Sequence, residues 1–190
     1  MKKIYCVIGR TGAGKDTITD ILVRMTGIQK VVSYTDAPIR SDQKNGREHW
    51  FITKEQMAEL LSKEDILAET TINGNRYCTT ASQLKSRNFY IIDPKGYEEL
   101  EKRNDVTLTP IVITAPKPVR RERSKSRKNF DFMARDISES PEFDRFYDRS
   151  DLLKRSDLAG EDAFFMNAED PEECALEIIT ATGLLMEENI

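Results

Sequence analysis

Glycines and a lysine near the amino terminus are spaced for binding phosphate. The run Gly9-Arg10-Thr11-Gly12-Ala13-Gly14-Lys15-Asp16-Thr17 follows the apolar segment 4–8 and precedes segment 18–25, whose apolar residues have helical spacing. Glycines allow a tight turn in which successive N–H groups face one anion, and the following helix presents its positive end. Lys15 adds a mobile charge for outer phosphates. Because this motif needs a strand before it and a helix after it, we predict a phosphate-binding loop rather than a chance glycine-rich turn.

The residue after Lys15 departs from the common form of such loops. A serine or threonine usually stands there and contacts Mg²⁺ through its hydroxyl, whereas this chain has Asp16, followed by Thr17. A carboxylate can also bind Mg²⁺, directly or through a water molecule. An acidic residue in the first turn of a helix is equally explained by the helix dipole. Both interpretations of Asp16 stay open.

Composition restricts the class of protein. The 190 residues are 38% hydrophobic and 33% charged, which suits one soluble domain with a small insert. A net charge of −4 gives no global attraction for nucleic acid, and no apolar run is long enough to span a membrane. The apolar run after Lys2 and Lys3 is too short for a secretory signal. We expect a cytoplasmic protein without nucleic-acid or membrane partners, either a monomer or a homodimer.

The three cysteines predict neither disulfides nor structural zinc. Cys6, Cys78 and Cys174 are odd in number and far apart, with no Cys-x-x-Cys pair and no cluster of histidines. This usage is typical of a reducing compartment.

Apolar segments alternate between strand and helix patterns. Strands are predicted at 3–8, 30–33, 89–92, 109–114 and 163–166. Helices are predicted at 15–26, 54–62, 80–86, 94–103, 117–155 with interruptions, and 170–186. Continuous apolar strands between helices imply parallel β-α-β units. We therefore predict an α/β fold of three layers, αβα, with a parallel central sheet.

Segment 34–80 interrupts this alternation. It contains short strand-like pieces at 49–53, 66–72 and 76–79, with turn signals at Asn45-Gly46 and Asn73-Gly74. We predict a small, mostly antiparallel insert beside the glycine loop. The expected organisation of 1–190 is a single domain with a core (1–33, 81–119 and 156–190), the insert (34–80) and a helical lid (120–155).

The lid is predicted from a local excess of positive charge. Six of the nine residues 120–128 are basic, and Arg135 follows, in a chain that is acidic overall. Such a run is often only a solvated helix face. Because the cluster opposes the net charge of a phosphate-binding protein, we favour a lid that closes over phosphates.

Six further segments follow the loop in a definite order. They are Ser33-Tyr34-Thr35-Asp36-Ala37-Pro38-Ile39-Arg40, Gly46-Arg47-Glu48-His49-Trp50-Phe51, Ile66-Leu67-Ala68-Glu69, Gly74-Asn75-Arg76-Tyr77-Cys78-Thr79-Thr80, Ile91-Ile92-Asp93-Pro94-Lys95-Gly96 and Phe164-Phe165-Met166-Asn167-Ala168-Glu169-Asp170. Each is weak alone, but with the loop they resemble the guanylate kinase family of nucleoside monophosphate kinases, from Lys2 to about Leu185.

The resemblance implies ATP and Mg²⁺ as cosubstrate and cofactor, GMP or dGMP as acceptor, and a set of site residues. Around ATP it implies Gly9, Thr11, Gly12, Ala13, Gly14, Lys15, Asp16 and Thr17. Around GMP it implies Ser33, Arg40, His49, Glu69, Tyr77, Thr79 and Asp93, with Glu69 and Thr79 on the base. Lys15 and the lid arginines Arg123, Arg127 and Arg135 would neutralise charge during transfer. Asp16 would serve Mg²⁺, and Asp93 would either help to hold Mg²⁺ through water or order the acceptor nucleotide.

Three positions depart from the family pattern. Ala37 replaces an arginine of the monophosphate site, and Cys78 replaces a glycine near the base. His49 stands where the family has a phosphate-binding tyrosine; it could donate to phosphate or be a surface histidine, and both interpretations stay open.

These departures leave other acceptors possible. The Gly-Lys-Asp spelling of the loop and the Glu48-His49 pair are similar to ribose 1,5-bisphosphate kinases, and phage-type deoxynucleotide kinases also use Gly-Lys-Asp-Thr. A non-catalytic binding module of the same fold is a further alternative. The intact glycines and Lys15 argue against it.

Overall fold

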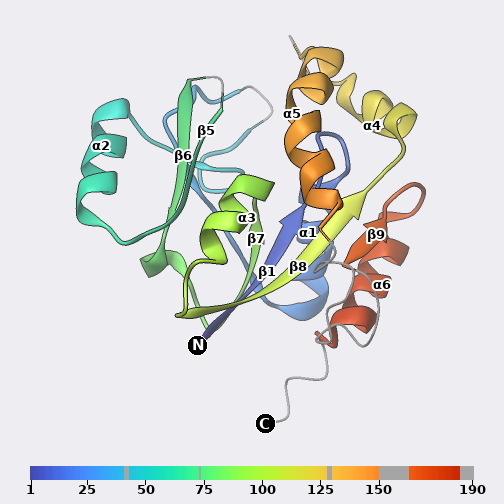
Figure 1. The fold of residues 1–190 in the computed structure, drawn as a ribbon, viewed down its shortest axis with the longest axis horizontal. Helices are drawn as coiled ribbons and strands as arrows, with labels where there is room; N and C mark the ends of the chain where they lie inside the picture. Colours follow the sequence, from blue (N-terminus) through green and yellow to red (C-terminus); the bar gives the residue numbers. More distant parts are fainter. Residues whose placement is uncertain (41–42, 73, 128–129, 150–162, 185–190) are drawn as a thin grey trace.

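A parallel sheet forms the centre of the molecule. The computed structural model describes residues 1–40, 43–72, 74–127, 130–149 and 163–184. Within these residues the sheet has five strands in the order β2-β7-β1-β8-β9, all paired in parallel (Figure 1). The strands are β1 (Lys2–Ile8), β2 (Gln29–Val31), β7 (Arg87–Ile91), β8 (Val106–Thr114) and β9 (Phe164–Met166). The predicted α/β class with a parallel central sheet is confirmed.

The two faces of β1 build two hydrophobic cores. Ile4, Cys6 and Ile8 pack into one core, and Tyr5 and Val7 pack into the other, because successive side chains of a strand point to opposite faces. All five of these side chains are fully buried. A strand covered on both faces needs this continuous apolar run, which is why the sequence pattern predicted β1 correctly.

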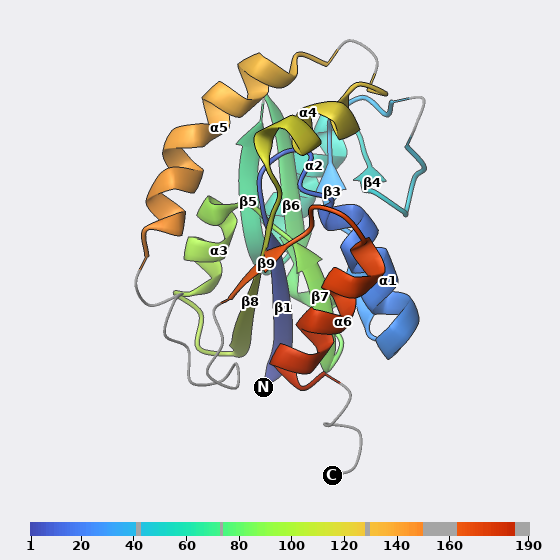
Figure 2. The same cartoon turned by 90° about the vertical axis from the view of Figure 1, so that its right-hand side faces the viewer.

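Helices cover both faces of the sheet. One core includes residues of α1 (Lys15–Thr26) and α6 (Pro171–Thr182), and these two helices lie side by side (Figure 2). The other core includes residues of α3 (Pro94–Leu100) and α5 (Phe132–Tyr147). The molecule thus has the three layers that the alternating pattern predicted.

A second sheet stands beside the carboxyl ends of the central strands. Among the described residues it has four strands in the order β4-β3-β6-β5, antiparallel except for the pair β3–β4. Its elements are β3 (Tyr34–Thr35), β4 (Trp50–Phe51), α2 (Lys54–Lys63), β5 (Ile66–Ile72) and β6 (Asn75–Thr80). They all come from the predicted insert, whose standing as a distinct unit within a single domain stays a prediction.

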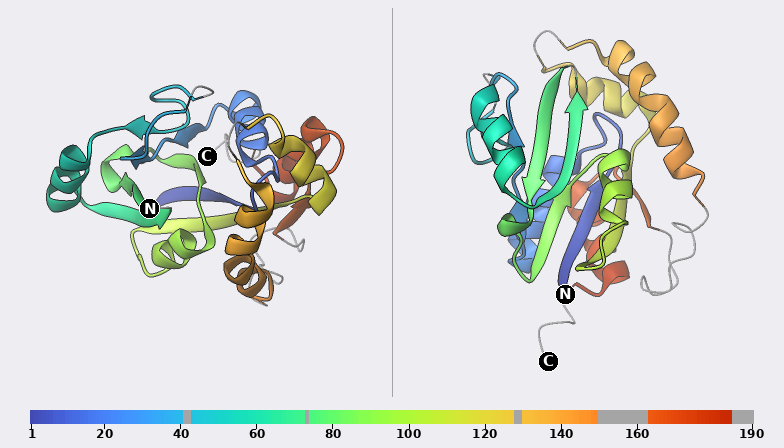
Figure 3. Two further views of the ribbon diagram at one scale, coloured as in Figure 1. Left: turned by 90° about the horizontal axis from the view of Figure 1, so that it is seen from above. Right: turned by 60° about the vertical axis from the view of Figure 1, so that its left-hand side comes forward.

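The insert and the predicted lid face each other across the top of the central sheet. The right-hand view of Figure 3 shows β5 and β6 on one side and α4 (Lys117–Ser124) with α5 on the other. The basic segment after residue 120 therefore lies opposite the insert. Residues 150–155 of the predicted lid and 156–162 of the predicted core lie outside the described residues, as do 185–186 of the last predicted helix.

The helix predicted at 80–86 is wrong. Only Ala81–Gln83 form a 3-10 turn, because Thr80 still belongs to β6 and Arg87 already begins β7. At the start of this turn, the Thr80 N–H donates to Gln83 Oε1 at 3.0 Å, and Leu84 after it is already extended. No helix in the described ranges is long and apolar enough to cross a membrane.

Candidate active site

The phosphate-binding loop lies between β1 and α1 and is closed by its own lysine. Lys15 Nζ donates to the Gly9 carbonyl at 2.6 Å and to the Arg10 carbonyl at 3.4 Å. Gly12 and Gly14 have φ of 80° and 93°, a region that favours glycine. Burial lowers the pKa of the Lys15 ammonium from its usual value. The loop thus presents backbone N–H groups and a desolvated cation at the start of a helix, the arrangement that binds phosphates.

One cavity of about 580 Å³ opens along this loop. The predicted ATP residues that line it are Thr11, Gly12, Gly14, Lys15, Asp16 and Thr17, and they are joined by Arg40, Arg123, Arg127, Asn167 and Pro171. We call it the donor cavity. The walls combine main-chain groups with three arginines, which suits a polyphosphate.

A second cavity of about 480 Å³ lies between the loop, the insert and α5. It brings together six of the residues predicted to bind GMP, namely Ser33, Arg40, His49, Glu69, Tyr77 and Asp93. We call it the acceptor cavity. Glu69 is exposed on β5, so its carboxylate is accessible to hydrogen-bond donors of a ligand.

Thr79 is the predicted GMP residue that the structure separates from the others. Its side chain is fully buried, and its hydroxyl donates to the Tyr90 hydroxyl at 2.7 Å. Thr79 does not line the acceptor cavity, whereas Tyr90 does. Burial raises the pKa of Tyr90, so its phenol stays protonated. A contact between Thr79 and a base stays a prediction.

The two cavities share one wall. Thr11, Lys15, Arg40 and Arg127 line both of them. Three of these four residues are cations, from the loop, the insert and the lid segment. Such convergence of positive charge between two cavities stabilises anionic groups that enter from both sides.

His49 lies within the acceptor cavity among aromatic side chains. Its Nδ1 is 3.4 Å from Ser33 Oγ, and its ring packs edge-on against Tyr77 with centroids 5.2 Å apart. Burial lowers the pKa of His49, Arg40 lowers it further, and Asp16 opposes the shift. The imidazole is therefore neutral near pH 7, and its neighbours Ser33 and Tyr77 both carry hydroxyl groups.

The other two departures from the family pattern are Ala37 and Cys78, and nothing in the structure explains Ala37. Asp36, which precedes Ala37, is buried and accepts the Arg76 N–H at 2.7 Å and its Nε at 3.4 Å. Cys78 packs under α2, with its Sγ 3.5 Å from Met57 Sδ, and does not line the acceptor cavity. Ala37 does not line the acceptor cavity either, so neither departure adds a group that binds phosphate there.

The three predicted lid arginines differ in placement. Arg123 lines the donor cavity and donates to the Asn167 carbonyl at 2.9 Å and the Ala13 carbonyl at 3.4 Å. Arg127 lines both cavities, while Arg135 lines only the acceptor cavity. The lid segment therefore delivers positive charge to the donor side, the junction and the acceptor side.

The predicted magnesium ligands lie on different walls. Asp16 is exposed in the first turn of α1 and lines the donor cavity beside Lys15. Asp93 Oδ1 accepts the Gly96 N–H at 2.7 Å as the cap of α3, and the residue lines the acceptor cavity. Magnesium usually takes one or two carboxylates, phosphate oxygens and water, so Asp16 fits the role of a ligand that joins a metal–nucleotide complex.

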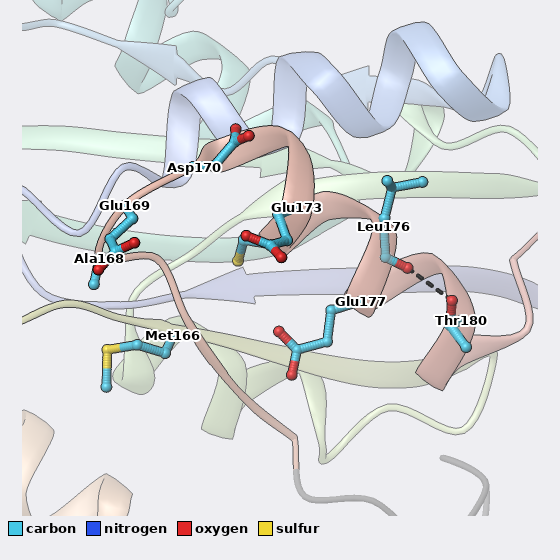
Figure 4. Close-up of a pocket in the computed structure, with 9 residues that line it drawn as sticks. Met166, Ala168, Glu169, Asp170, Glu173, Leu176, Glu177 and Thr180 are labelled. Carbon is cyan, nitrogen blue, oxygen red and sulfur yellow. Dashed lines mark hydrogen bonds between the residues drawn. The ribbon is translucent and has the colours of Figure 1, made fainter.

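A third cavity, of about 610 Å³, lies along the outer side of α6 and does not suit phosphate. Figure 4 shows Glu173 and Glu177 on that helix, with Glu169 and Asp170 in the loop before it. No lysine or arginine lines this cavity in the described part of the chain. Its acidic wall would repel a phosphorylated ligand.

Several polar residues of the site were missed by the sequence analysis. Asn167 Nδ2 donates to the Ala13 carbonyl at 2.8 Å, while its Oδ1 is buried at the donor cavity without a hydrogen-bond partner among the described residues. Glu139 of α5 contacts Thr11 of the loop. Arg135 and Glu139 are four residues apart on a helix, and this spacing could have predicted their ion pair. No local pattern could have predicted the contact between Glu139 and Thr11.

The fold and the two cavities define a P-loop protein with an α/β core, in which residues of the predicted insert and arginines of the predicted lid line the cavities. Residues 1–152 match the family described as Guanylate kinase. This match covers most of the chain, which therefore belongs to the guanylate kinase family.

Known relatives agree with that assignment. A Fusobacterium nucleatum protein named guanylate kinase is 31% identical over 84 residues, covering 44% of this chain and 45% of that protein. One from Bradyrhizobium diazoefficiens is 26% identical over 120 residues, covering 60% and 55%. The matches span about half the length of these curated relatives.

A solved structure supports the fold. The crystal structure of guanylate kinase from Anaplasma phagocytophilum has a TM-score of 0.66 and 21% identity, covering 100% of this chain and 87% of that one. At this identity the likeness shows the fold alone.

Proposed function

We propose that this protein transfers a phosphoryl group from ATP to a nucleoside monophosphate, with GMP or dGMP as the preferred acceptor. The observation that carries the proposal is the shared wall of the two cavities, where Lys15, Arg40 and Arg127 converge. Transfer between two phosphates needs both substrates to meet at one point where negative charge is neutralised. The names of the family and of its relatives support the choice of donor and acceptor.

The reaction needs positioning and charge neutralisation from the protein. An oxygen of the acceptor phosphate bonds to the γ-phosphorus of ATP while the bond to the β–γ bridging oxygen breaks, which releases ADP. The loop N–H groups and Lys15 hold the donor phosphates, and Arg40 holds the acceptor phosphate against them. No side chain has to form a covalent intermediate.

Magnesium enters with ATP in this proposal. Asp16 is the residue that would hold it, directly or through water, because its carboxylate lines the donor cavity beside Lys15. When bound, the metal neutralises charge on the outer phosphates. Asp93 has one oxygen committed to the cap of α3, so its part is to order the acceptor side.

Glu69 gives the acceptor cavity a preference for guanine. A carboxylate offers two acceptor oxygens, which match the adjacent ring N–H and amino group of that base. Glu69 lies on the insert, across the cavity from the loop.

A coupled assay for ADP release tests the function. Purified protein is supplied with ATP, Mg²⁺ and, separately, GMP, dGMP, the other nucleoside monophosphates and ribose 1,5-bisphosphate. We expect the highest kcat/KM with GMP or dGMP. Turnover of ribose 1,5-bisphosphate without turnover of nucleotides would assign the other kinase activity, and nucleotide binding without any turnover would indicate a binding module.

A further inference from the structure

A buried carboxylate from the lid segment contacts the phosphate-binding loop. The side chain of Glu139, in α5, is only 5% exposed. Its Oε1 accepts the backbone N–H of Thr11 at 2.8 Å, and its Oε2 accepts the Thr11 hydroxyl at 3.0 Å. Glutamate is rarely this buried unless its charge is compensated, so the local cations decide what this carboxylate does.

The compensating cation is an arginine predicted to act in transfer. Arg135 lies one turn earlier on α5, and its Nε is 3.3 Å from Glu139 Oε2. Both residues line the acceptor cavity together with Lys15. The negative charge of Glu139 also raises the pKa of Lys15 against the effect of burial.

Thr11 is held from its other side as well. Its carbonyl accepts Arg120 Nη1 of α4 at 3.1 Å, and Arg120 is paired with the buried Asp136 of α5 at 2.8 Å. Helices α4 and α5 therefore hold the same loop residue through its carbonyl and its N–H. Thr11 is thus fixed by both helices, and it also lines both cavities.

A structural role alone does not explain the charge of Glu139. A glutamine at this position could accept the Thr11 N–H equally well and would not repel an acceptor phosphate. The carboxylate is needed to pair with a cation. An arginine whose Nε is held in this way loses less rotamer freedom when its terminal nitrogens bind a phosphate.

We propose that Glu139 is a positioning residue for phosphoryl transfer: it holds Arg135 at the acceptor cavity and Thr11 in the loop that borders it. This inference rests on the proposed function. Its effect falls on the transition state, because charge on the transferring group is what the oriented guanidinium neutralises. Glu139 does not itself contact the reacting atoms.

The main experiment compares Glu139→Gln with Glu142→Gln. Glu142 lies three residues later on α5, accepts the Lys95 N–H at 2.9 Å and does not line the acceptor cavity. We expect kcat of Glu139→Gln to fall by about 10- to 100-fold, with KM for GMP and Kd for ATP changed by less than about threefold. The Glu142→Gln variant should keep wild-type kcat. Equal kcat in the two variants would overturn the proposal.

A double-mutant cycle separates positioning from a general loss of structure. In an Arg135→Lys background, Glu139→Gln should lower kcat by less than about twofold, since the group it orients is already altered. Multiplicative losses would show that Glu139 acts independently of Arg135. Melting temperatures of all variants are measured alongside; a fall in stability with unchanged kcat would assign Glu139 a structural role only.

A third measurement does not need turnover. In the ¹⁵N-labelled full chain, the Arg135 Nε–H signal should shift and exchange faster in Glu139→Gln but not in Glu142→Gln. If the wild type turns over no acceptor, the proposed function fails, and this signal still decides whether Glu139 holds Arg135. An Arg135 signal unchanged by Glu139→Gln would overturn the inference whatever the activity.

Discussion

The donor and acceptor cavities meet at one wall but are built in different ways. The donor side takes six of its lining residues from one continuous run, Thr11–Thr17, which β1 and α1 place. The acceptor side depends on side chains spread from Ser33 to Phe143, which come from the insert, from the end of β7 and from α5. A site centred on one continuous loop keeps its shape when one side chain, such as Asp16, is unusual. A site assembled from dispersed side chains changes its ligand preference with each residue that is replaced.

The largest expected effect is at the shared wall. Lys15→Ala should lower kcat with every acceptor by about 10³-fold, because the ammonium neutralises the phosphates on which both cavities converge. ADP release under saturating ATP and acceptor measures it. The matched control is Lys63→Ala, an exposed lysine of α2. Loss of turnover for one acceptor only would contradict a shared role.

A smaller and selective effect is expected from the acceptor side. Glu69→Ala should lower kcat/KM for GMP by about 10- to 100-fold, since two charge-assisted hydrogen bonds to the base are lost. Activity with UMP or AMP, which lack that pair of adjacent donors, should change little.

The control for Glu69 is Glu99→Ala, an exposed carboxylate on α3. It should leave all acceptors unaffected. If Glu69→Ala reduced turnover of every monophosphate equally, Glu69 would not be a base-reading residue, and the contrast between a general donor side and a selective acceptor side would fail.

The donor side could be predicted from sequence because its determinants are local. The apolar run of β1, the glycines and the start of α1 lie within about one strand, loop and helix, so spacing alone places them. Both glycines with positive φ in the loop, Gly12 and Gly14, stand where the pattern requires tight turns. The same logic failed at 80–86, where strand pairing on both sides left room only for a 3-10 turn.

On the acceptor side, the sequence predicted the residues that belong to short motifs but not the contacts between distant parts of the chain. Glu69, Tyr77 and His49 lie around the acceptor cavity, and their contacts with GMP stay predictions. The contact of Glu139 with Thr11 spans 128 residues, and no local pattern encodes such a pairing. The hydroxyl of Thr79 likewise bonds to Tyr90 on a neighbouring sheet, which only the packing of the two sheets determines.

Thr79→Val tests whether Thr79 lies outside the acceptor cavity. Valine keeps the shape but leaves the buried Tyr90 hydroxyl without its partner, so the free energy of unfolding should fall by about 1–2 kcal/mol. Because Thr79 does not line the cavity, the ratio of kcat/KM for GMP and AMP should stay within about twofold of wild type. Denaturant unfolding and the coupled assay measure the two quantities. A selective loss with GMP would instead show that Thr79 reaches the base when substrate binds.

The smallest expected effect is a change with pH in the KM for GMP, and it depends on His49. In the free protein burial lowers the pKa of His49, with Arg40 acting in the same direction, so its contribution to stability is lost as pH falls through the lowered pKa. An acceptor phosphate reverses this preference, since a dianion favours the imidazolium. KM for GMP should therefore rise by about two- to fivefold between pH 6 and pH 8, and His49→Gln should remove that rise.

The glutamine variant is also the control for titration of the phosphate itself, because any pH dependence that it retains cannot come from the imidazole. If wild type and His49→Gln show the same dependence, His49 is an uncharged wall of the acceptor cavity, and Arg40 alone supplies the insert's positive charge there.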